Sequence, residues 1–283
     1  MFGFRSDGRK LKTVPPFFRV IPNVMLERED SQVYFKQDII LKDMDEYIDK
    51  KAKEGIRLSY MNIIYAALVR IVAERPYLNR FAMNGSLYAR NKIYVSLAIK
   101  KTLSDEGQET TIKLPFSGNE NIFEIKEKLD NAVEINKEKA MQNKTDYTAK
   151  LLSLIPNMFI RITVKLLRFL DRHGAMPKKL IEVSPFHTSV FLTNVGSLGI
   201  DSIYHHLYNF GTTSMFFAMG KKKKSYVYDD DEIKEERCIT IAFVGDERIC
   251  DGYYYATSFK LLCKYLKKPE ILEEHAEVKQ DIK

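Results

Sequence analysis

The sequence predicts an α/β fold in which helices pack on a mixed β-sheet as a two-layer sandwich. Helix-like and strand-like segments alternate along the 283 residues, without the regular rhythm of a doubly wound fold. No glycine-rich turn joins a strand to a helix, which argues against a dinucleotide-binding fold or a P-loop. Hydrophobic residues make up 45% of the chain, enough for a substantial core. We therefore expect a single domain over residues 1–283.

The first predicted elements lie between residues 31 and 75. Residues 31–41 are rich in β-forming side chains and predict a strand. Residues 42–53 are charged, with apolar residues at helical spacing, and predict a helix. Residues 58–75 give the clearest helical pattern, with Ser59 as the expected N-cap and Pro76 as the residue that ends the helix.

The later elements continue the alternation. In chain order we expect strands at residues 92–101 and 109–115, a helix at 123–139, strands at 184–194, 212–219 and 237–244, and a helix at 254–266. The basic run at residues 221–224 and the acidic patch at residues 229–232 then fall in a solvated hairpin loop.

Charge and cysteine content limit the classes of function. Lys and Arg number 45 against 38 acidic residues, which gives a net charge of +7. This moderate excess suggests an anionic ligand or surface, and no nucleic-acid partner is expected because no reading motif accompanies it. The cysteines, Cys238, Cys250 and Cys263, lack metal-type spacing, so we expect a reduced, cytoplasmic protein without a metal site. The amino terminus lacks the apolar core of a signal peptide.

The segment at residues 140–182 contains an apolar helical stretch at residues 151–170. Arg161, Lys165 and Arg168 fall on roughly one stripe of that helix. The pattern is typical of a helix that lies on a membrane surface. It is also typical of a helix that covers a core or an acyl tunnel while the cationic stripe faces water. We expect the second arrangement, because helices of that kind are commoner, and leave membrane association as the alternative.

The residues at 246–252 read DERICDG. They resemble the His-x-x-x-Asp-Gly active-site motif of the chloramphenicol acetyltransferase-like superfamily, which includes the dihydrolipoyl acyltransferase catalytic domains of 2-oxoacid dehydrogenase complexes. The Asp-Gly pair and its spacing are retained, but Glu247 stands at the position of the histidine. Residues 58–81, with a Pro-x-Leu-Asn turn, and residues 191–199, FLTNVGSLG, are similar to the family in the same order. The resemblance covers roughly three quarters of the chain.

The resemblance implies both a fold and an activity. It implies a chloramphenicol acetyltransferase-like two-layer sandwich and a homotrimer with active sites between subunits. It also implies transfer of an acyl group from coenzyme A, or another thioester, to a thiol or hydroxyl acceptor. Coenzyme A would be a substrate, with no cofactor bound covalently. Neither a lipoyl domain nor a subunit-binding domain is recognisable in these 283 residues, so we expect a free-standing catalytic domain.

The family motif assigns a role to each matching residue. Glu247 takes the place of the histidine that accepts the proton of the attacking group. Thr193 matches the Ser or Thr whose hydroxyl donates to the tetrahedral oxyanion. Asn194 matches the family asparagine, and Asp251 matches the aspartate that orders the active-site loop. Gly252 is expected to permit a close approach or an unusual backbone angle.

The replacement of the histidine leaves the chemistry open. A thiol has a pKa of about 8.5 and a glutamate about 4.3, so this proton transfer costs about 6 kcal/mol, against about 3 for histidine. Burial of Glu247 in an apolar pocket would narrow the gap. Alternatively, Glu247 pairs with Arg248 or another cation and the site is inactive. His205 and His206 are the candidate alternative bases, whereas His187, on the same predicted strand as the motif threonine, is expected to lie too far from it.

Three functions are therefore compatible with the sequence. The first is an acyltransferase that uses Glu247 and Thr193, with residues 221–224 as a possible contact for the phosphates of coenzyme A. The second is a catalytically inactive, trimeric family member that binds a ligand or serves as a scaffold. The third is a membrane-surface protein that uses residues 151–170.

Overall fold

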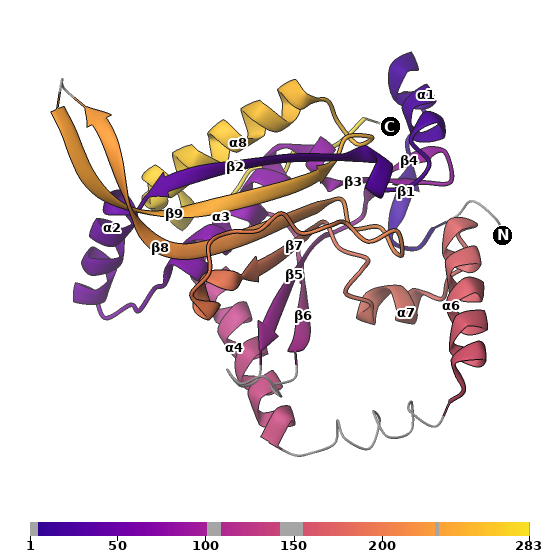
Figure 1. The fold of residues 1–283 in the computed structure, drawn as a ribbon, viewed down its shortest axis with the longest axis horizontal. Coiled ribbons are helices and arrows are strands. Elements are labelled where there is room, and N and C mark those ends of the chain that lie inside the picture. Colours follow the sequence, from indigo (N-terminus) through magenta and orange to yellow (C-terminus); the bar gives the residue numbers. More distant parts are fainter. Residues whose placement is uncertain (1–4, 101–108, 142–154, 230–231, 283) are drawn as a thin grey trace.

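A mixed six-stranded sheet forms the centre of the structure (Figure 1). The computed structural model describes residues 5–100, 109–141, 155–229 and 232–282. The strands are β2 (Gln32–Ile40), β5 (Ile93–Lys100), β6 (Glu109–Phe116), β7 (Val190–Asn194), β8 (Met215–Asp229) and β9 (Glu232–Asp246). They are arranged in the order β2-β9-β8-β7-β5-β6. Strand β7 runs parallel to β5 and β8, and the other neighbours are antiparallel.

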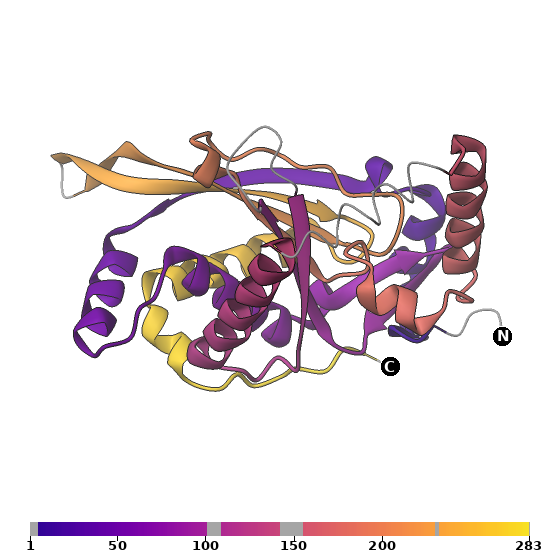
Figure 2. The same ribbon diagram turned by 90° about the horizontal axis from the view of Figure 1, so that it is seen from below.

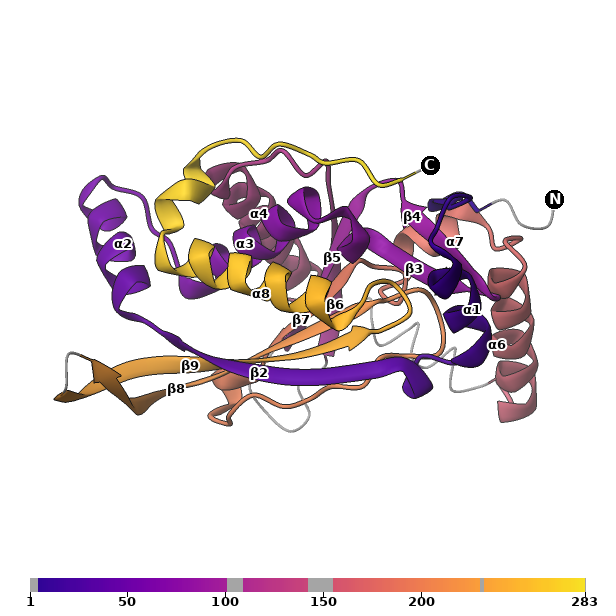
Figure 3. The ribbon, with the colours of Figure 1, turned by 90° about the horizontal axis from the view of Figure 1, so that it is seen from above.

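One face of this sheet is covered by a layer of helices, as Figures 2 and 3 show. The layer consists of α2 (Lys42–Lys53), α3 (Tyr60–Glu74), α4 (Ile122–Met141) and α8 (Gly252–Lys267). Helix α3 begins at the expected cap: the Asn62 N–H donates to Ser59 Oγ at 3.3 Å, and the Ser59 N–H donates to Asn62 Oδ1 at 2.9 Å. The short 3₁₀ helix η2 (Pro76–Asn79) begins with the predicted terminator. The predicted two-layer α/β class is confirmed.

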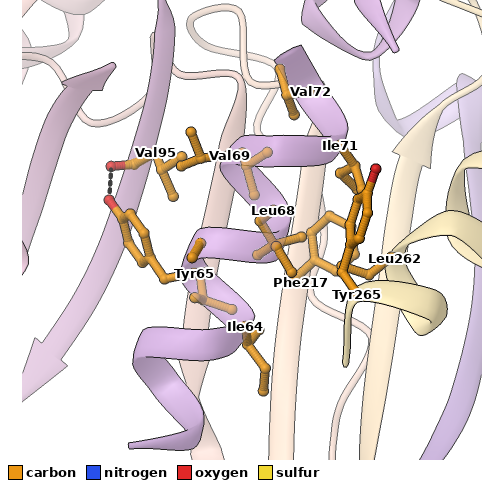
Figure 4. Packing of buried hydrophobic residues seen from close by; sticks show 14 of the residues in the cluster. Ile64, Tyr65, Leu68, Val69, Ile71, Val72, Val95, Phe217, Leu262 and Tyr265 are labelled. Carbon is orange, nitrogen blue, oxygen red and sulfur yellow. Dashed lines mark hydrogen bonds between the residues drawn. The ribbon is translucent and has the colours of Figure 1, made fainter. Parts of the chain in front are cut away.

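Helix α3 is the most deeply buried element of this layer. Its side chains pack between the sheet and α8, where Leu68 lies among Phe217 of β8 and Leu262 of α8 (Figure 4). Complete burial of a side chain of this size contributes about 1.5–3 kcal/mol. The Tyr65 hydroxyl donates to the Val95 carbonyl at 3.0 Å, which ties the helix to β5. These contacts hold the central strands as a fixed platform for the ends of β7 and β9.

A second, three-stranded sheet lies beside the first. It has the order β1-β4-β3, with β1 (Gly8–Lys10), β3 (Arg80–Met83) and β4 (Ser86–Arg90). Asn84 and Gly85 connect β3 to β4 with positive φ angles of 48° and 69°. An Asn-Gly pair is the usual sequence of such a two-residue hairpin turn. This Asn-Gly pair was the sequence signal for the second sheet, which the prediction from the sequence did not include. The remaining elements are α1 (Pro16–Val24), η1 (Glu29–Ser31), α6 (Asn157–Arg172), α7 (Lys178–Val183), η3 (Val195–Leu198) and η4 (Pro269–Glu273).

Two strand predictions had the wrong bounds. The strand expected at residues 184–194 forms only over Val190–Asn194. Pro185 has no N–H for a ladder, and the His187 N–H donates to the Ser184 carbonyl at 3.3 Å in a turn. The strand expected at residues 212–219 begins at Met215 and continues to Asp229. In the three residues before it the hydroxyl groups bond elsewhere: Thr212 accepts from Arg90, and Thr213 and Ser214 donate to the carbonyls of Phe186 and Arg80.

The basic run at residues 221–224 lies inside β8 and not in a loop. The hairpin was predicted correctly, but β8 and β9 stay paired out to Asp229 and Glu232. The ammonium of Lys223 is 2.9 Å from Asp201, and that of Lys224 is 2.7 Å from Glu235. These lysines therefore already neutralise acidic side chains of the same chain.

Helix α6 does not cover the core. The first part of the stretch at residues 151–170 lies outside the described residues, but the helix itself stands at one end of the molecule with its apolar residues exposed (Figure 1). The expectation that it packs its apolar face inward is therefore wrong. No helix in the described ranges is long and apolar enough to cross a membrane.

Candidate functional site

The turn that follows β9 is fixed by a buried carboxylate, Asp246. Arg248 Nε lies 2.8 Å from Asp246 Oδ1, and Arg248 Nη2 lies 2.7 Å from Oδ2. The Ser31 hydroxyl donates to Asp246 Oδ1 at 3.0 Å, and Arg28 Nε is 3.9 Å from Oδ2. The Glu247 N–H donates to the Ser31 carbonyl at 2.8 Å. The backbone of the motif is therefore held against the start of β2.

The side chain of Glu247 is exposed. Within the described residues its carboxylate has no hydrogen bond and no ion pair. The expected pairing with Arg248 is absent because the guanidinium of Arg248 is used by the buried Asp246. Because Glu247 is exposed, the described residues of a single chain do not form the closed apolar pocket that a glutamate base requires. Glu247 is thus available for contact with another molecule.

The rest of the motif begins helix α8. Asp251 is its N-cap, and the Tyr254 N–H donates to Asp251 Oδ1 at 2.8 Å. Gly252 has no positive φ, and a Cβ added there would meet nothing within 4 Å, so the close approach expected for this glycine is wrong. Cys250 is buried, and burial raises the pKa of its thiol. A thiol of this kind is a poor nucleophile.

Thr193 and Asn194 form the end of strand β7. Thr193 is half-buried, and its neighbours across the sheet are small residues, Ala98 on β5 and Ala218 on β8. Asn194 Oδ1 accepts from the Ser197 N–H at 3.2 Å and thereby caps η3. The strand thus ends in an ordered turn that fixes the threonine hydroxyl at the sheet surface.

The sheet register separates the two candidate residues. Thr193 is paired with Ala218 on β8, whereas Met215 is paired with Gly245 on β9. Glu247 follows Gly245 by two residues, in the direction away from Thr193. The separation amounts to five residues along the strand, or about 16 Å at about 3.3 Å per residue, in addition to two strand spacings. One chain therefore does not bring these side chains together.

The candidate alternative bases lie in the irregular segment between β7 and β8. The ring of His205 stacks on Phe216 with centroids 4.0 Å apart, and Phe216 stacks on Phe191 at 4.9 Å. Phe191 and Thr193 are two residues apart on one strand and point to the same face. His205 is therefore on the face of the sheet that carries the threonine. The ring of His206 stacks on His205 at 4.6 Å and is exposed.

His187 belongs to a separate, buried cluster. Its Nε2 lies 3.2 Å from Asp171 Oδ2 and its Nδ1 lies 2.8 Å from Ser184 Oγ. Burial lowers the pKa of His187, against the opposing effect of Asp171. Residues 184–194 do not form the straight strand that was assumed. The observed contacts of His187 nevertheless give it another role, because they hold the end of α6 in place.

Asp246 is the site residue that sequence reasoning missed. Its indication was an acidic residue at the end of an apolar strand, two positions before an arginine. Buried carboxylates of this kind are paired. In the described ranges no group of three or more His, Cys, Asp or Glu side chains is placed to hold a metal ion.

The part of the chain that contains the candidate site is similar to a known protein family. Residues 176–273, which include both halves of the candidate site, match the catalytic-domain model of the 2-oxoacid dehydrogenases acyltransferase family. No curated protein sequence matches the chain. A probable dihydrolipoamide acetyltransferase from Listeria monocytogenes 4b F2365 superposes with a TM-score of 0.59 at 13% identity, over 92% of this chain and 95% of that one.

Two further solved structures share the fold. The dihydrolipoamide acetyltransferase of Azotobacter vinelandii, studied for the role of a serine, a histidine and an asparagine in its catalytic mechanism, gives a TM-score of 0.60 at 12% identity, over 93% of this chain and 94% of that one. A chloramphenicol acetyltransferase gives 0.52 at 12% identity, over 92% of this chain and 100% of that one. The resemblance is confirmed: the chain has the chloramphenicol acetyltransferase-like α/β fold, and its residues 176–273 match the acyltransferase catalytic domain of 2-oxoacid dehydrogenases.

Proposed function

We propose that the protein transfers an acyl group from coenzyme A, or another thioester, to a thiol or hydroxyl acceptor, in sites between the subunits of a homotrimer. The main observation in support is that the family match includes both Thr193 and Glu247. Within one chain these residues lie about 16 Å apart along the strand direction. Both remain accessible, so a neighbouring subunit can bring its Glu247 to Thr193. A solved relative at 12% identity is the cubic core of a pyruvate dehydrogenase complex, which supports an assembly of several subunits.

Each residue then has a distinct task. The Thr193 hydroxyl donates to the oxyanion that develops on the thioester carbonyl. Removal of such a donor lowers kcat by about 10²–10³-fold. Glu247 of the neighbour accepts the proton of the attacking thiol or hydroxyl, and returns it to the departing thiolate when the carbon–sulfur bond of the donor thioester breaks. Apolar surface of the subunit that carries Thr193 would surround this Glu247, favour its protonated form and make it a stronger base. Asp246 holds the turn in place, and coenzyme A enters as a substrate.

An inactive, trimeric family member is the second candidate. It is favoured by the exposure of Glu247, because nothing in its own chain surrounds the carboxylate with apolar groups. A glutamate that stays solvated is a poorer base than histidine by about 3 kcal/mol. Such a protein would bind a ligand or scaffold partners through the same subunit contacts.

Steady-state turnover separates the two candidates. The purified protein is mixed with acetyl-coenzyme A and a panel of small dithiol and alcohol acceptors, and release of free coenzyme A is measured. We expect turnover that Thr193→Val lowers by about 10²-fold in kcat with little change in KM, because the oxyanion contact is made mainly in the transition state. Thr163→Val, at an exposed threonine on α6, serves as the matched control and leaves the rate unchanged. Absence of turnover with every acceptor, together with no binding of coenzyme A, contradicts the proposal.

A further inference from the structure

Helix α6 exposes a broad apolar face. Ile162 and Leu166 are each 55% exposed. The exposed apolar side chains of the helix are Met158, Phe159, Ile160, Ile162, Val164, Leu166 and Phe169. At 100° per residue, these positions span roughly two thirds of the helix circumference. Figures 1 and 3 place the helix at the end of the molecule opposite the β8–β9 hairpin.

The basic stripe of the same helix is anchored to the body of the protein at its C-terminal end, whereas Arg161 and Lys165 are exposed. Arg161, Lys165, Arg168 and Arg172 recur at helical spacing along one side. Arg168 pairs at 2.8 Å with Glu27, which follows α1, and Arg172 pairs with the same carboxylate. A helix of a water-soluble domain ordinarily turns its apolar side inward. Here only the last two arginines of the charged side are anchored, and the apolar side chains stay exposed.

This orientation is fixed by buried contacts at the last turn of α6. Asp171 is 2% exposed, and its carboxylate lies 2.8 Å from Arg5 Nη2 and 3.2 Å from His187 Nε2. A buried carboxylate with two partners resists rotation of the helix, because rotation would leave the charge unpaired. The outward apolar face is therefore a built feature of the fold.

Helix α1 adds apolar surface at the same end of the molecule, where Figure 1 shows it beyond the last turn of α6. Phe17, Val20, Val24 and Leu26 are all more than half exposed. Glu27 follows them directly and carries the ion pairs to α6, so the two segments are joined. Together with the exposed apolar residues of α6, these four side chains form what we call the α1–α6 apolar surface.

We propose that the α1–α6 apolar surface binds the surface of a membrane that contains anionic lipids. The charged residues exposed on α6 are all basic, and its one acidic residue, Asp171, is buried. A wide apolar face with Lys and Arg on the polar side is the pattern of a helix that lies in the membrane interface. A contact between two copies of a helix uses a narrower apolar stripe. Basic side chains near the membrane interface complement anionic headgroups. A protein partner would instead have to place acidic side chains opposite these basic residues.

Vesicle flotation at about 0.15 M salt, a physiological ionic strength, tests this proposal. Vesicles of phosphatidylcholine are compared with vesicles that also contain phosphatidylserine. We expect the protein to float with the anionic vesicles, and Ile162→Asp with Leu166→Asp to leave it in the soluble fraction. Ile233→Asp is the matched control: it also replaces an exposed isoleucine, 73% exposed on the β8–β9 hairpin, and should float like the wild type.

A second variant keeps the apolar face and removes charge. Within the described residues Arg161 and Lys165 have no ion pair, so Arg161→Gln with Lys165→Gln should not disturb folding. At about 1 kcal/mol per basic residue near an anionic surface, each neutralisation should weaken binding to the anionic vesicles by roughly fivefold. Circular dichroism confirms that both double variants are folded.

Two results overturn the proposal. One is a wild-type protein that stays soluble with both kinds of vesicle; a mass by light scattering that then falls in the Ile162→Asp, Leu166→Asp variant would make the surface a contact between copies of the chain. The other is flotation that is the same with neutral and anionic vesicles, or the same for the wild type and that variant. Neither readout requires acyl transfer, so the outcome is independent of the proposed activity.

Discussion

Replacing Asp246 by alanine lowers the free energy of unfolding by about 3–5 kcal/mol, the usual cost of removing one partner from a buried ion pair. The carboxylate is fully buried and is shared by Arg248, Arg28 and Ser31. Without it two buried guanidinium groups lose their counter-charge. The turn that carries Glu247 loses its anchor at the same time.

Urea denaturation at a fixed protein concentration measures this effect, because oligomerisation makes stability depend on concentration. Asp251→Ala is the matched control at the other end of the motif, where an exposed N-cap aspartate is lost. It should cost about 1 kcal/mol. A loss below that value for Asp246→Ala would show that the buried carboxylate does not hold the turn.

Replacing Glu247 by histidine restores the family base and raises kcat for acyl transfer by up to about 10²-fold, the gain being smaller the more the subunit interface strengthens Glu247 as a base. The difference of about 3 kcal/mol between a histidine and an ordinary glutamate as acceptor of a thiol proton corresponds to about two orders of magnitude in rate. Because Glu247 is exposed and makes no hydrogen bond through its carboxylate, the exchange should leave stability unchanged.

The rate is measured as release of free coenzyme A, with melting temperatures recorded for each variant. Glu247→Gln removes the base and should fall below the wild type. Glu277→His introduces a histidine at another exposed glutamate and should have no effect. If Glu247→His and Glu247→Gln have equal rates, residue 247 does not act as the base.

Local signals were sufficient for some of the helices, but not for α1 or α7, which were not predicted. The charged helix at Lys42–Lys53 was predicted with its observed bounds. Ser59 caps α3 as expected, because both the cap and the apolar periodicity that follows it depend on residues that are neighbours in the sequence. Helix α8 was expected at residues 254–266 and forms over Gly252–Lys267, but Asp251 was not predicted as its N-cap.

Elements whose environment is set by distant residues were predicted less well. The outer halves of β8 and β9 are not buried on either face, and residues 221–224 are all lysines, so they show no alternation that would mark a strand. The face that α6 turns outward depends on Glu27 and Asp171, which the helical pattern does not identify as partners. Burial of Asp246 likewise depends on Ser31, more than two hundred residues earlier in the chain.

The two halves of the candidate site were found from the sequence, but their relation was not. Both Thr193 and Glu247 were identified by their match to family motifs. Their distance follows from the pairing of β7, β8 and β9, which the sequence alone did not provide. The same pairing makes contact between two subunits the simplest way to complete the site.

Complementation between inactive variants tests this central claim most directly. Thr193→Val and Glu247→Gln subunits are prepared separately, then unfolded together and refolded, and coenzyme A release is compared with that of each variant alone. In hybrids formed at random, a site with Thr193 from one subunit and Glu247 from the next should recover about one quarter of the wild-type rate. A mixture that remains as inactive as its separate components would contradict an active site shared between subunits.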